Sequence, residues 1–353
     1  MSDRDPSAPL SVFPFVVGCP RSGTTLLQTM LDCHPDLAVP PESHFIPRLG
    51  RRFADGWHGS ARVPRFADAL FEGRRFQYWG ISREDVVGLL ERNQPTDLAA
   101  AIRLLYASWA ERAGKPAYAD KTPRYLTHIS RLSKLFEEAR FVHLIRDGRD
   151  VALSMAEAFE RGPQTAAQAA IYWGTRVAEG REQGLGLGSG RYLELRYEEL
   201  MADPEATLRQ LCEFIDLPFD QAMLAPERRA EAIIAGYPDA GVHRNLGRPL
   251  ERRRDWHRAM PDSERRDFEL LAGELLAELR YPVENGAKGA TAERQRRTLL
   301  ASEFEGLRHS LFRAGRKAER RGELLRRQRR TRWARLGASL SRGAARLRGK
   351  RKP

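Results

Sequence analysis

Residues 13–25 have the sequence FPFVVGCPRSGTT. The apolar run over 13–17 predicts a buried strand, and the Gly, Pro and Ser residues after it predict a turn. Residues 24–33 carry apolar side chains at helical spacing and are followed by Pro35, which predicts a helix that ends there. When a strand, a glycine-containing loop and a helix follow in this order, backbone N–H groups and the helix N-terminus converge on a position suited to a phosphate.

The loop from Gly18 to Thr25 differs from the phosphate loop of nucleoside triphosphatases. The pattern GxxxxGK[ST] would place Lys at position 24, where this chain has Thr24, and the cation here is Arg21 inside the loop. This difference favours a phosphate ester other than a nucleoside triphosphate. The competing interpretation is an ordinary glycine-rich turn before a helix.

The chain as far as residue 285 alternates between predicted strands and helices. Further strands are expected at residues 140–145 and 191–196. Further helices are expected at residues 82–92, 97–113, 123–138, 164–184 and 204–215, with another that begins beyond Asp147. This alternation predicts an α/β fold with a P-loop-NTPase-like parallel sheet flanked by helices.

Charge is distributed unevenly along the 353 residues, which carry 60 basic and 47 acidic side chains and a net charge of +13. Residues 286–353 hold 22 basic and 5 acidic side chains, a net charge of +17, which leaves −4 for residues 1–285. We therefore expect a flexible leader over residues 1–12, a folded domain over 13–285 and a basic, partly helical or disordered C-terminal tail over 286–353. A nucleic-acid-binding core is disfavoured because the basic charge belongs to the tail.

Three uses of the tail compete with a solvated appendage: adhesion to an anionic membrane face, nonspecific nucleic-acid contact and docking to a partner. Among these three uses we favour the membrane face, and the solvated appendage stays the alternative. The odd number of cysteines and the lack of a CxxC spacing indicate neither a disulfide framework nor a zinc site. No signal peptide and no run of ~18 apolar residues is evident, so we expect a cytoplasmic protein. Its basic tail would be the part that contacts the inner membrane face.

A second motif, RDGRDVALS, occupies residues 146–154. Arg146 follows the expected strand 140–145, and the carboxyl ends of strands are where open α/β sheets bind ligands. Ser154 lies about two helical turns further on. An arginine and a hydroxyl at this position could bind a second phosphate. The alternative is that Asp147 caps a helix and Arg146 is a solvent-exposed cation.

Together these segments resemble the 5′-phosphosulfate loop and the 3′-phosphate motif of sulfotransferases that use 3′-phosphoadenosine 5′-phosphosulfate (PAPS). The resemblance covers most of residues 13–282 and is closest to the tyrosylprotein-sulfotransferase-like branch and its bacterial relatives. The motifs that carry it are PRSGTTLL, HPD at 34–36, PESHFIP at 41–47, DKTP at 120–123, LIRDGRDVALS at 144–154 and RYEEL at 196–200.

The resemblance implies a role for each matching residue in binding the donor. The 5′-phosphosulfate would be bound by the loop residues Arg21, Ser22, Gly23, Thr24 and Thr25. Arg146 and Ser154 would bind the 3′-phosphate, and Tyr197 would lie near the adenine. In the late loop over residues 241–254, Asn245, Arg248 and Arg252 are candidates for phosphate contact, whereas Trp256 is expected to pack the loop down.

The resemblance also implies catalytic roles. Glu42 matches the branch's catalytic glutamate and would act as the general base. Lys121 matches the lysine that neutralises charge on the leaving phosphate, and Arg21 would meet charge on the transferring group. The branch has an arginine where this chain has His44, which departs from the pattern for peptide recognition and makes His44 a second candidate base.

These implications predict a PAPS-dependent sulfotransferase that needs no metal and acts on a hydroxyl or amine of a small-molecule, glycan or lipid acceptor. One alternative is a P-loop kinase-like phosphotransferase, against which the missing GK[ST] counts. Another is a non-catalytic nucleotide-binding or membrane-tethered scaffold, against which Glu42 and Lys121 count.

Overall fold

A computed structural model describes residues 10–158, 162–235, 255–284 and 290–312. The described chain divides into two units. Residues 10–145 and 183–235 form the first unit, and residues 146–182 and those from 255 onwards form the second.

Strand β1 (Phe13–Gly18) is buried along its whole length in the first unit and pairs on both sides. Its neighbours are β5 (Ala139–Ile145) and the two-residue β4 (Asp120–Lys121), and β5 pairs in turn with β6 (Tyr192–Arg196). All these pairs are parallel, in the order β4-β1-β5-β6. The predicted parallel sheet is therefore confirmed, whereas β4 was not predicted because it has no apolar run.

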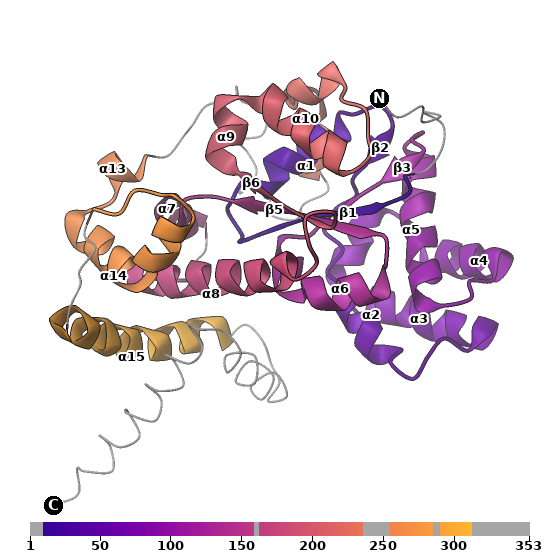
Figure 1. Ribbon diagram of the computed structural model, residues 1–353. Coiled ribbons are helices and arrows are strands. Elements are labelled where there is room, and N and C mark those ends of the chain that lie inside the picture. The colour runs from indigo at the N-terminus through magenta and orange to yellow at the C-terminus, as the bar shows by residue number, and fades with distance from the viewer. Residues whose placement is uncertain (1–9, 159–161, 236–254, 285–289, 313–353) are drawn as a thin grey trace, which may run out of the picture. The chain divides into compact units, whose positions relative to one another are not determined.

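Alternate residues of β1 face two different apolar cores, as the two-residue period of a strand requires. Phe13, Phe15 and Val17 pack into the first core. The helices of that core are α2 (Ile46–Arg52), α3 (Val63–Phe71), α4 (Arg83–Asn93), α5 (Leu98–Arg112) and α6 (Ile129–Leu135). Val16 packs on the opposite face against α1 (Thr24–Asp32), α9 (Tyr197–Ala202) and α10 (Pro204–Phe214). Helices thus flank both faces of the sheet, as predicted (Figure 1).

The predicted helix starts at residues 82 and 97 are confirmed by side-chain caps. Ser82 accepts a hydrogen bond from the backbone of Asp85 and forms a capping box with it at the start of α4. Asp97 caps α5 by accepting from the backbone N–H of Ala100. These polar side chains satisfy N–H groups that have no partner inside the helix.

The predicted helix over residues 123–138 is wrong in its extent. Pro123–His128 form a 3-10 helix, η3, and α6 ends at Leu135. Phe136 adopts an extended conformation there and buries its ring against Phe13 and Phe15, so burial of one aromatic ring ends the helix early.

Short elements connect these parts of the first unit. Strands β2 (Leu37–Ala38) and β3 (Ala117–Tyr118) form a separate parallel pair. The other short elements are η1 (Gly59–Arg62), η2 (Arg74–Trp79), η4 (Gln221–Leu224) and α11 (Glu227–Ala235).

The second unit is helical in its described residues. It contains α7 (Gly148–Ala158), α8 (Ala166–Leu185, whose last residues belong to the first unit), α13 (Trp256–Ala259), α14 (Asp262–Glu278) and α15 (Ala290–Phe312). Arg149 is fully buried there, with ion pairs of 2.8 Å to Asp147 and 2.6 Å to Glu269. Its guanidinium also lies 3.5 Å from the ring centroid of Trp256.

The expected basic tail begins with a helix, since α15 starts at Ala290 and packs on α14. Glu303 of α15 accepts hydrogen bonds from Thr165 and Gln168, and Arg296 pairs with Glu274. The partly helical character is thereby confirmed. Residues 313–353 of the tail and residues 1–9 of the leader lie outside the described residues, and the expected domain boundaries stay a prediction.

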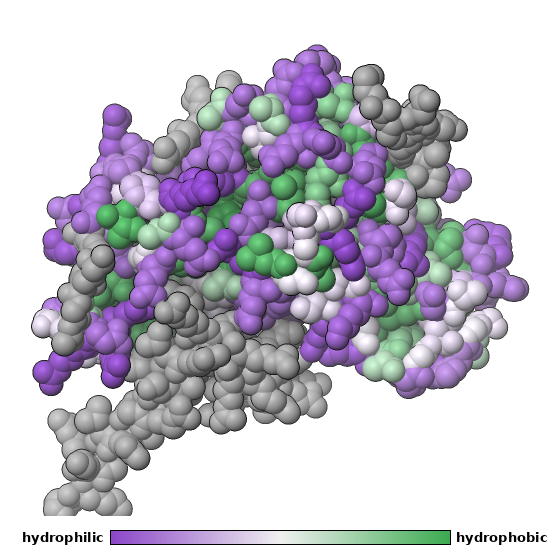
Figure 2. All heavy atoms as spheres, in the orientation of Figure 1, coloured by the Kyte–Doolittle hydropathy of each residue, from purple (hydrophilic) through white to green (hydrophobic). Residues whose placement is uncertain are grey.

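Hydrophilic side chains cover much of the face drawn in Figure 2, with apolar residues in small patches between them. Among the described residues, Leu185 is the large apolar side chain with substantial exposure, at 59%. Every helix in the described residues is too short or too polar to cross a membrane.

Candidate active site

The loop between β1 and α1 depends on backbone geometry that few residue types allow. Gly23 caps α1 with a φ of +93°, and a Cβ atom built on it would lie 2.5 Å from Cδ2 of Tyr197. Only glycine avoids both the unfavourable φ and this clash. Arg21 has a φ of +76°, a left-handed conformation that costs energy for a residue with a side chain. Strain of this kind is common at functional sites.

The same loop has the features of an anion site. The Ser22 hydroxyl oxygen is buried and has no hydrogen-bond partner among the described residues. Helix α1 has neither a side-chain cap nor an acidic residue in its first turn, as far as the described chain shows. Its N-terminal N–H groups and the positive end of its dipole therefore suit a negatively charged group. The residues present fit a phosphate, and phosphate binding at this loop stays a prediction.

Helix α1 also fixes the segment that leads to Glu42. Gln28 of α1 donates from Nε2 to the carbonyl oxygens of Val39 (3.2 Å) and Pro40 (3.0 Å). The next carbonyl, that of Pro41, accepts from Nε1 of Trp79 at 2.9 Å. The helix that begins at the loop thus holds the backbone that carries the predicted base.

Four predicted site residues from three segments form one continuous set of contacts. The Lys121 ammonium lies 2.8 Å from Oε1 of Glu42 and 3.4 Å from the Thr25 hydroxyl. Nε2 of His44 lies 2.7 Å from Oε2 of the same carboxylate. The Lys121 side chain is fully buried, and β4 places it beside Val16 of β1. The fold therefore brings the loop, the carboxylate and the cation together.

The charge of Glu42 reflects opposing effects. Burial by itself would raise its pKa, but the Lys121 ammonium and the hydrogen bond from His44 outweigh burial and hold the pKa of Glu42 well below its usual range. Glu42 is accordingly an anion at neutral pH. His44 meets it with a φ of +50°, a second left-handed conformation in a non-glycine residue of this site.

Such a site can accept a proton on a carboxylate and stabilise negative charge on an anion bound at the loop. Within the described residues, no group of three or more His, Cys, Asp or Glu side chains could hold a metal ion.

The remaining predicted residues lie as follows. Tyr197 is the first residue of α9, and its ring contacts Gly23. In the second unit, Arg146 donates to Oδ2 of Asp150 at 3.3 Å, and Oδ1 of Asp150 accepts from the backbone of Trp256. Ser154 is buried in α7. Trp256 is buried. Asn245, Arg248 and Arg252 lie outside the described residues, so the expected packing of Trp256 against the late loop stays a prediction.

Sequence reasoning missed two residues beside this site, Ser43 and Asp120. Both are fully enclosed, and their side chains hydrogen-bond to each other at 2.8 Å. They belong to the PESHFIP and DKTP motifs, immediately next to Glu42 and Lys121. Their position inside the motifs was the available signal, because neither residue type is unusual by itself.

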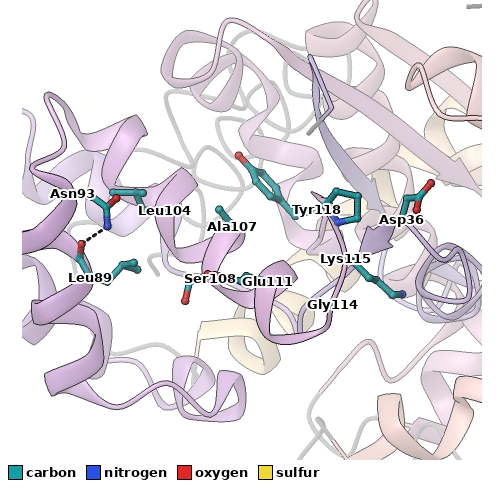
Figure 3. A pocket seen from close by; sticks show the side chains of 11 residues that line it. Asp36, Leu89, Asn93, Leu104, Ala107, Ser108, Glu111, Gly114, Lys115 and Tyr118 are labelled. Atoms are coloured by element: carbon teal, nitrogen blue, oxygen red, sulfur yellow. Dashed lines mark hydrogen bonds between the residues drawn. The ribbon is translucent and has the colours of Figure 1, made fainter. Parts of the chain in front are cut away.

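A cavity of about 900 Å³ opens elsewhere in the first unit (Figure 3). One of its walls is Tyr118, whose ring packs on Phe13 at the start of β1, whereas the loop follows the end of that strand. No predicted site residue lines this cavity. Its lining is Asp36, Leu89, Asn93, Leu104, Ala107, Ser108, Glu111, Gly114, Lys115, Pro116 and Tyr118.

Comparison with known proteins identifies the family of this chain. The sequence pattern of the sulfotransferase family matches residues 15–221, more than half of the chain. The protein therefore belongs to the sulfotransferase family, and the resemblance found in its motifs is confirmed.

Two relatives show how far the similarity extends. Protein-tyrosine sulfotransferase A of Caenorhabditis elegans is 28% identical over 224 residues, which are 62% of this chain and 53% of that protein. Nodulation protein NoeE of Sinorhizobium fredii is 35% identical over 156 residues, which are 43% of this chain and 32% of that protein. The chain thus spans about half the length of the first relative and a third of the second.

A solved structure has the same fold. The sulfotransferase domain from the curacin biosynthetic pathway superposes with a TM-score of 0.50 at 19% identity, covering 78% of this chain and 100% of that domain. The predicted fold class is confirmed by this match.

Proposed function

We propose that this protein transfers a sulfuryl group from PAPS to a hydroxyl or amine of an acceptor, with Glu42 as the general base. Membership of the sulfotransferase family supports the reaction type. The observation that carries the assignment of residues is the position of Lys121, whose ammonium contacts both Thr25 of the loop and the Glu42 carboxylate. One cation thus connects the predicted donor site with the predicted base.

The reaction requires one bond to form at sulfur and one to break. The acceptor oxygen or nitrogen attacks the sulfur atom and loses its proton to Glu42. The bond between sulfur and the bridging oxygen of the 5′-phosphate breaks, and 3′-phosphoadenosine 5′-phosphate (PAP) leaves. Lys121 and Arg21 stabilise the negative charge that develops on the leaving and transferring groups.

The low pKa of Glu42 makes it a weak base while Lys121 is bound to it. As charge develops on the bridging oxygen, the Lys121 ammonium is attracted to that oxygen and its contact with Glu42 weakens. Burial then acts on Glu42 with less opposition and raises its basicity during the step that needs it. His44, on the other carboxylate oxygen, is placed to share the proton.

We assign the parts of the donor as the motifs imply. The 5′-phosphosulfate is bound by residues 21–25, an assignment supported by the buried Ser22 hydroxyl and the uncapped α1 N-terminus. The 3′-phosphate is assigned to Arg146 and Ser154 and the adenine to the surroundings of Tyr197, both from sequence resemblance.

For the acceptor we propose a small molecule, a glycan or a lipid. His44 stands where the tyrosylprotein branch has an arginine, which argues against the peptide recognition of that branch. We also propose a cytoplasmic location. We further propose that the basic tail contacts an anionic membrane face, a proposal that rests on the charge of the tail alone. Flotation with vesicles of anionic lipid tests the second proposal, and a chain that stays unbound at low salt contradicts it.

The function is tested with radiolabelled PAPS and a panel of acceptors: a tyrosine peptide, a phenol, an amino sugar and a glycolipid. We expect label on at least one non-peptide acceptor, and much less of it with Glu42→Gln. The phosphotransferase alternative would be supported instead if PAPS labelled none of them while γ-labelled ATP with Mg²⁺ did.

A further inference from the structure

Asp120 is a fully buried carboxylate directly before Lys121 in the sequence. Its Oδ2 accepts three hydroxyl hydrogen bonds, from Ser43 (2.8 Å), Tyr106 (2.7 Å) and Thr122 (3.1 Å). Its Oδ1 has no hydrogen-bond partner in the described part of the chain, and no cation there pairs with it. Burial raises the pKa of Asp120, which is the penalty for a carboxyl group enclosed without a counter-ion.

The hydroxyl groups around Asp120 form a hydrogen-bond network in which the donor and the acceptor of each contact can be assigned. Ser43 and Thr122 use their protons on Asp120, so the 2.7 Å contact between Ser43 and Tyr125 is donated by Tyr125. The oxygens that remain as acceptors bind backbone groups: Thr122 Oγ1 accepts from the N–H of Ser43 (3.0 Å), and the Tyr125 oxygen accepts from that of Ile46 (3.1 Å).

This network ends on the backbone at both sides of the base. Ser43 lies between Glu42 and His44 in the chain, and its side chain and backbone N–H are both bound. Ile46, two residues after His44, is bound as well. On the other side, Asp120 and Thr122 flank Lys121. Lys121, Glu42 and His44 are therefore each adjacent in the chain to a residue of the network.

We propose that Asp120 and Ser43 are positioning residues for sulfuryl transfer, which hold the segment of Glu42 and His44 against β4 so that Lys121 meets the carboxylate. This inference rests on the proposed function for its catalytic meaning. An apolar side chain at position 120 would avoid the desolvation cost of a buried carboxylate. Three hydroxyl groups that donate to the same oxygen of Asp120 instead fix both the direction and the distance of each contact. Apolar packing does not provide such directional contacts.

The test compares variants of the same network. Ser43→Ala removes the hydroxyl next to Glu42, and Asp120→Asn removes the charge while keeping the shape. The matched control lies outside this network: Ser133→Ala also removes a buried serine hydroxyl, but one that bonds the carbonyl oxygen of Ser130 in α6. Unfolding midpoints are measured for all variants, so that a general loss of stability is recognised.

Two measurements follow on the full chain. The first is the titration of the Glu42 carboxyl by carbon-13 NMR, assigned with Glu42→Gln. The second is turnover of PAPS together with PAP affinity. In the Ser43→Ala and Asp120→Asn variants we expect the titration midpoint of the Glu42 carboxyl to rise toward its ordinary pKa of ~4.3. Turnover should fall about 10- to 100-fold with PAP affinity unchanged, because a small misplacement affects the reaction more than binding.

The control should resemble the wild type in all these measurements. The inference is overturned if the Ser43→Ala variant titrates and turns over as the wild type does, or if Ser133→Ala has an equal effect. If the wild type neither binds PAP nor transfers sulfuryl groups, the proposed function fails, whereas the NMR titration still decides whether the network sets the Glu42 contact.

Discussion

Glu42 is the single residue on which the chemistry of the site depends most directly. Burial, Lys121 and His44 all act on one carboxylate, and the two donors prevail. A neutral amide of the same shape would keep one accepting oxygen but would lose the second acceptor, the negative charge and the basicity. Substitution of Glu42 therefore separates proton transfer from donor binding.

Glu42→Gln is expected to lower turnover by about 10²- to 10⁴-fold, the usual contribution of a general base. PAP affinity should stay within about twofold, because Glu42 is not assigned to the nucleotide. Glu91→Gln on the exposed side of α4 is the matched control and should behave as wild type. Measurement of turnover and of PAP affinity on the same preparations checks this. A variant that loses PAP affinity while keeping turnover would show that the base is assigned wrongly.

The lowered pKa of Glu42 also predicts a pH dependence of stability. Its carboxyl binds a proton more weakly in the folded than in the unfolded chain, so the stabilisation is fully present above the unfolded pKa of ~4.3 and is lost as pH falls through the acid range. The difference in unfolding free energy between wild type and Glu42→Gln should stay constant from about pH 7 to 5. Below that it should decline by at most ~1.4 kcal/mol per pH unit. Urea unfolding at several pH values measures this difference, and a difference independent of pH would contradict the account.

Among the elements, the junction of β1 and α1 is the one that a small change disrupts most. Gly23 has a left-handed φ and lies against the Tyr197 ring. Gly114 also has a positive φ, of +68°, but a Cβ there would meet nothing within 4 Å. A side chain at either glycine would be penalised by the positive φ, but only at Gly23 would it also clash with a neighbouring ring.

Gly23→Ala is therefore expected to destabilise the protein by more than Gly114→Ala, which should cost about 1 kcal/mol for the backbone alone. Gly23→Ala should also weaken PAP binding, because the loop must shift to relieve the clash with Tyr197. Denaturant midpoints and PAP titrations of both variants measure these effects. Equal behaviour of the two variants would show that the contact with Tyr197 has no consequence.

The sequence predicts those elements whose side-chain pattern is local. Residues 13–17 and 140–145 are apolar runs, and they correspond to β1 and β5. Asp120 and Lys121 form β4 only because Val16 and its neighbours offer a partner strand, and such pairing leaves no trace in a two-residue stretch. Helix α6 ends early for a similar reason, since the burial of Phe136 is decided by rings that are distant in sequence.

For the molecule as a whole, the two units are stabilised differently. The first unit has apolar cores on both faces of its sheet, whereas the second encloses the charged set of Arg149, Asp147 and Glu269. Arg149→Met would leave two buried carboxylates without their cation and should cost about 3–5 kcal/mol.

Arg297→Met is the matched control for that change, because it breaks an exposed pair with Glu293 within α15. Such a pair contributes little, so the control should change stability by less than ~0.5 kcal/mol. Urea unfolding followed by tryptophan fluorescence compares the two variants. If Arg149→Met costs no more than the control, the buried cluster does not stabilise the second unit.

The candidate site is only partly legible in the sequence. Motif resemblance singles out Thr25, Glu42, His44 and Lys121, and the structure brings these four together. Their order of contact and the network around Asp120 require the fold, because Ser43 and Asp120 lie far apart in the chain. The lowering of the Glu42 pKa likewise follows from its distances to Lys121 and His44, which no motif encodes.

Calorimetric titration of the whole chain with PAP, AMP and ATP, each with and without Mg²⁺, decides whether the nucleotide is a PAPS-type donor. We expect that PAP binds most tightly, that Mg²⁺ makes no difference, and that loss of the 3′-phosphate weakens binding at least about tenfold, or ~1.4 kcal/mol. Tighter binding of ATP with Mg²⁺ than of PAP would contradict the assignment of the donor and favour phosphoryl transfer.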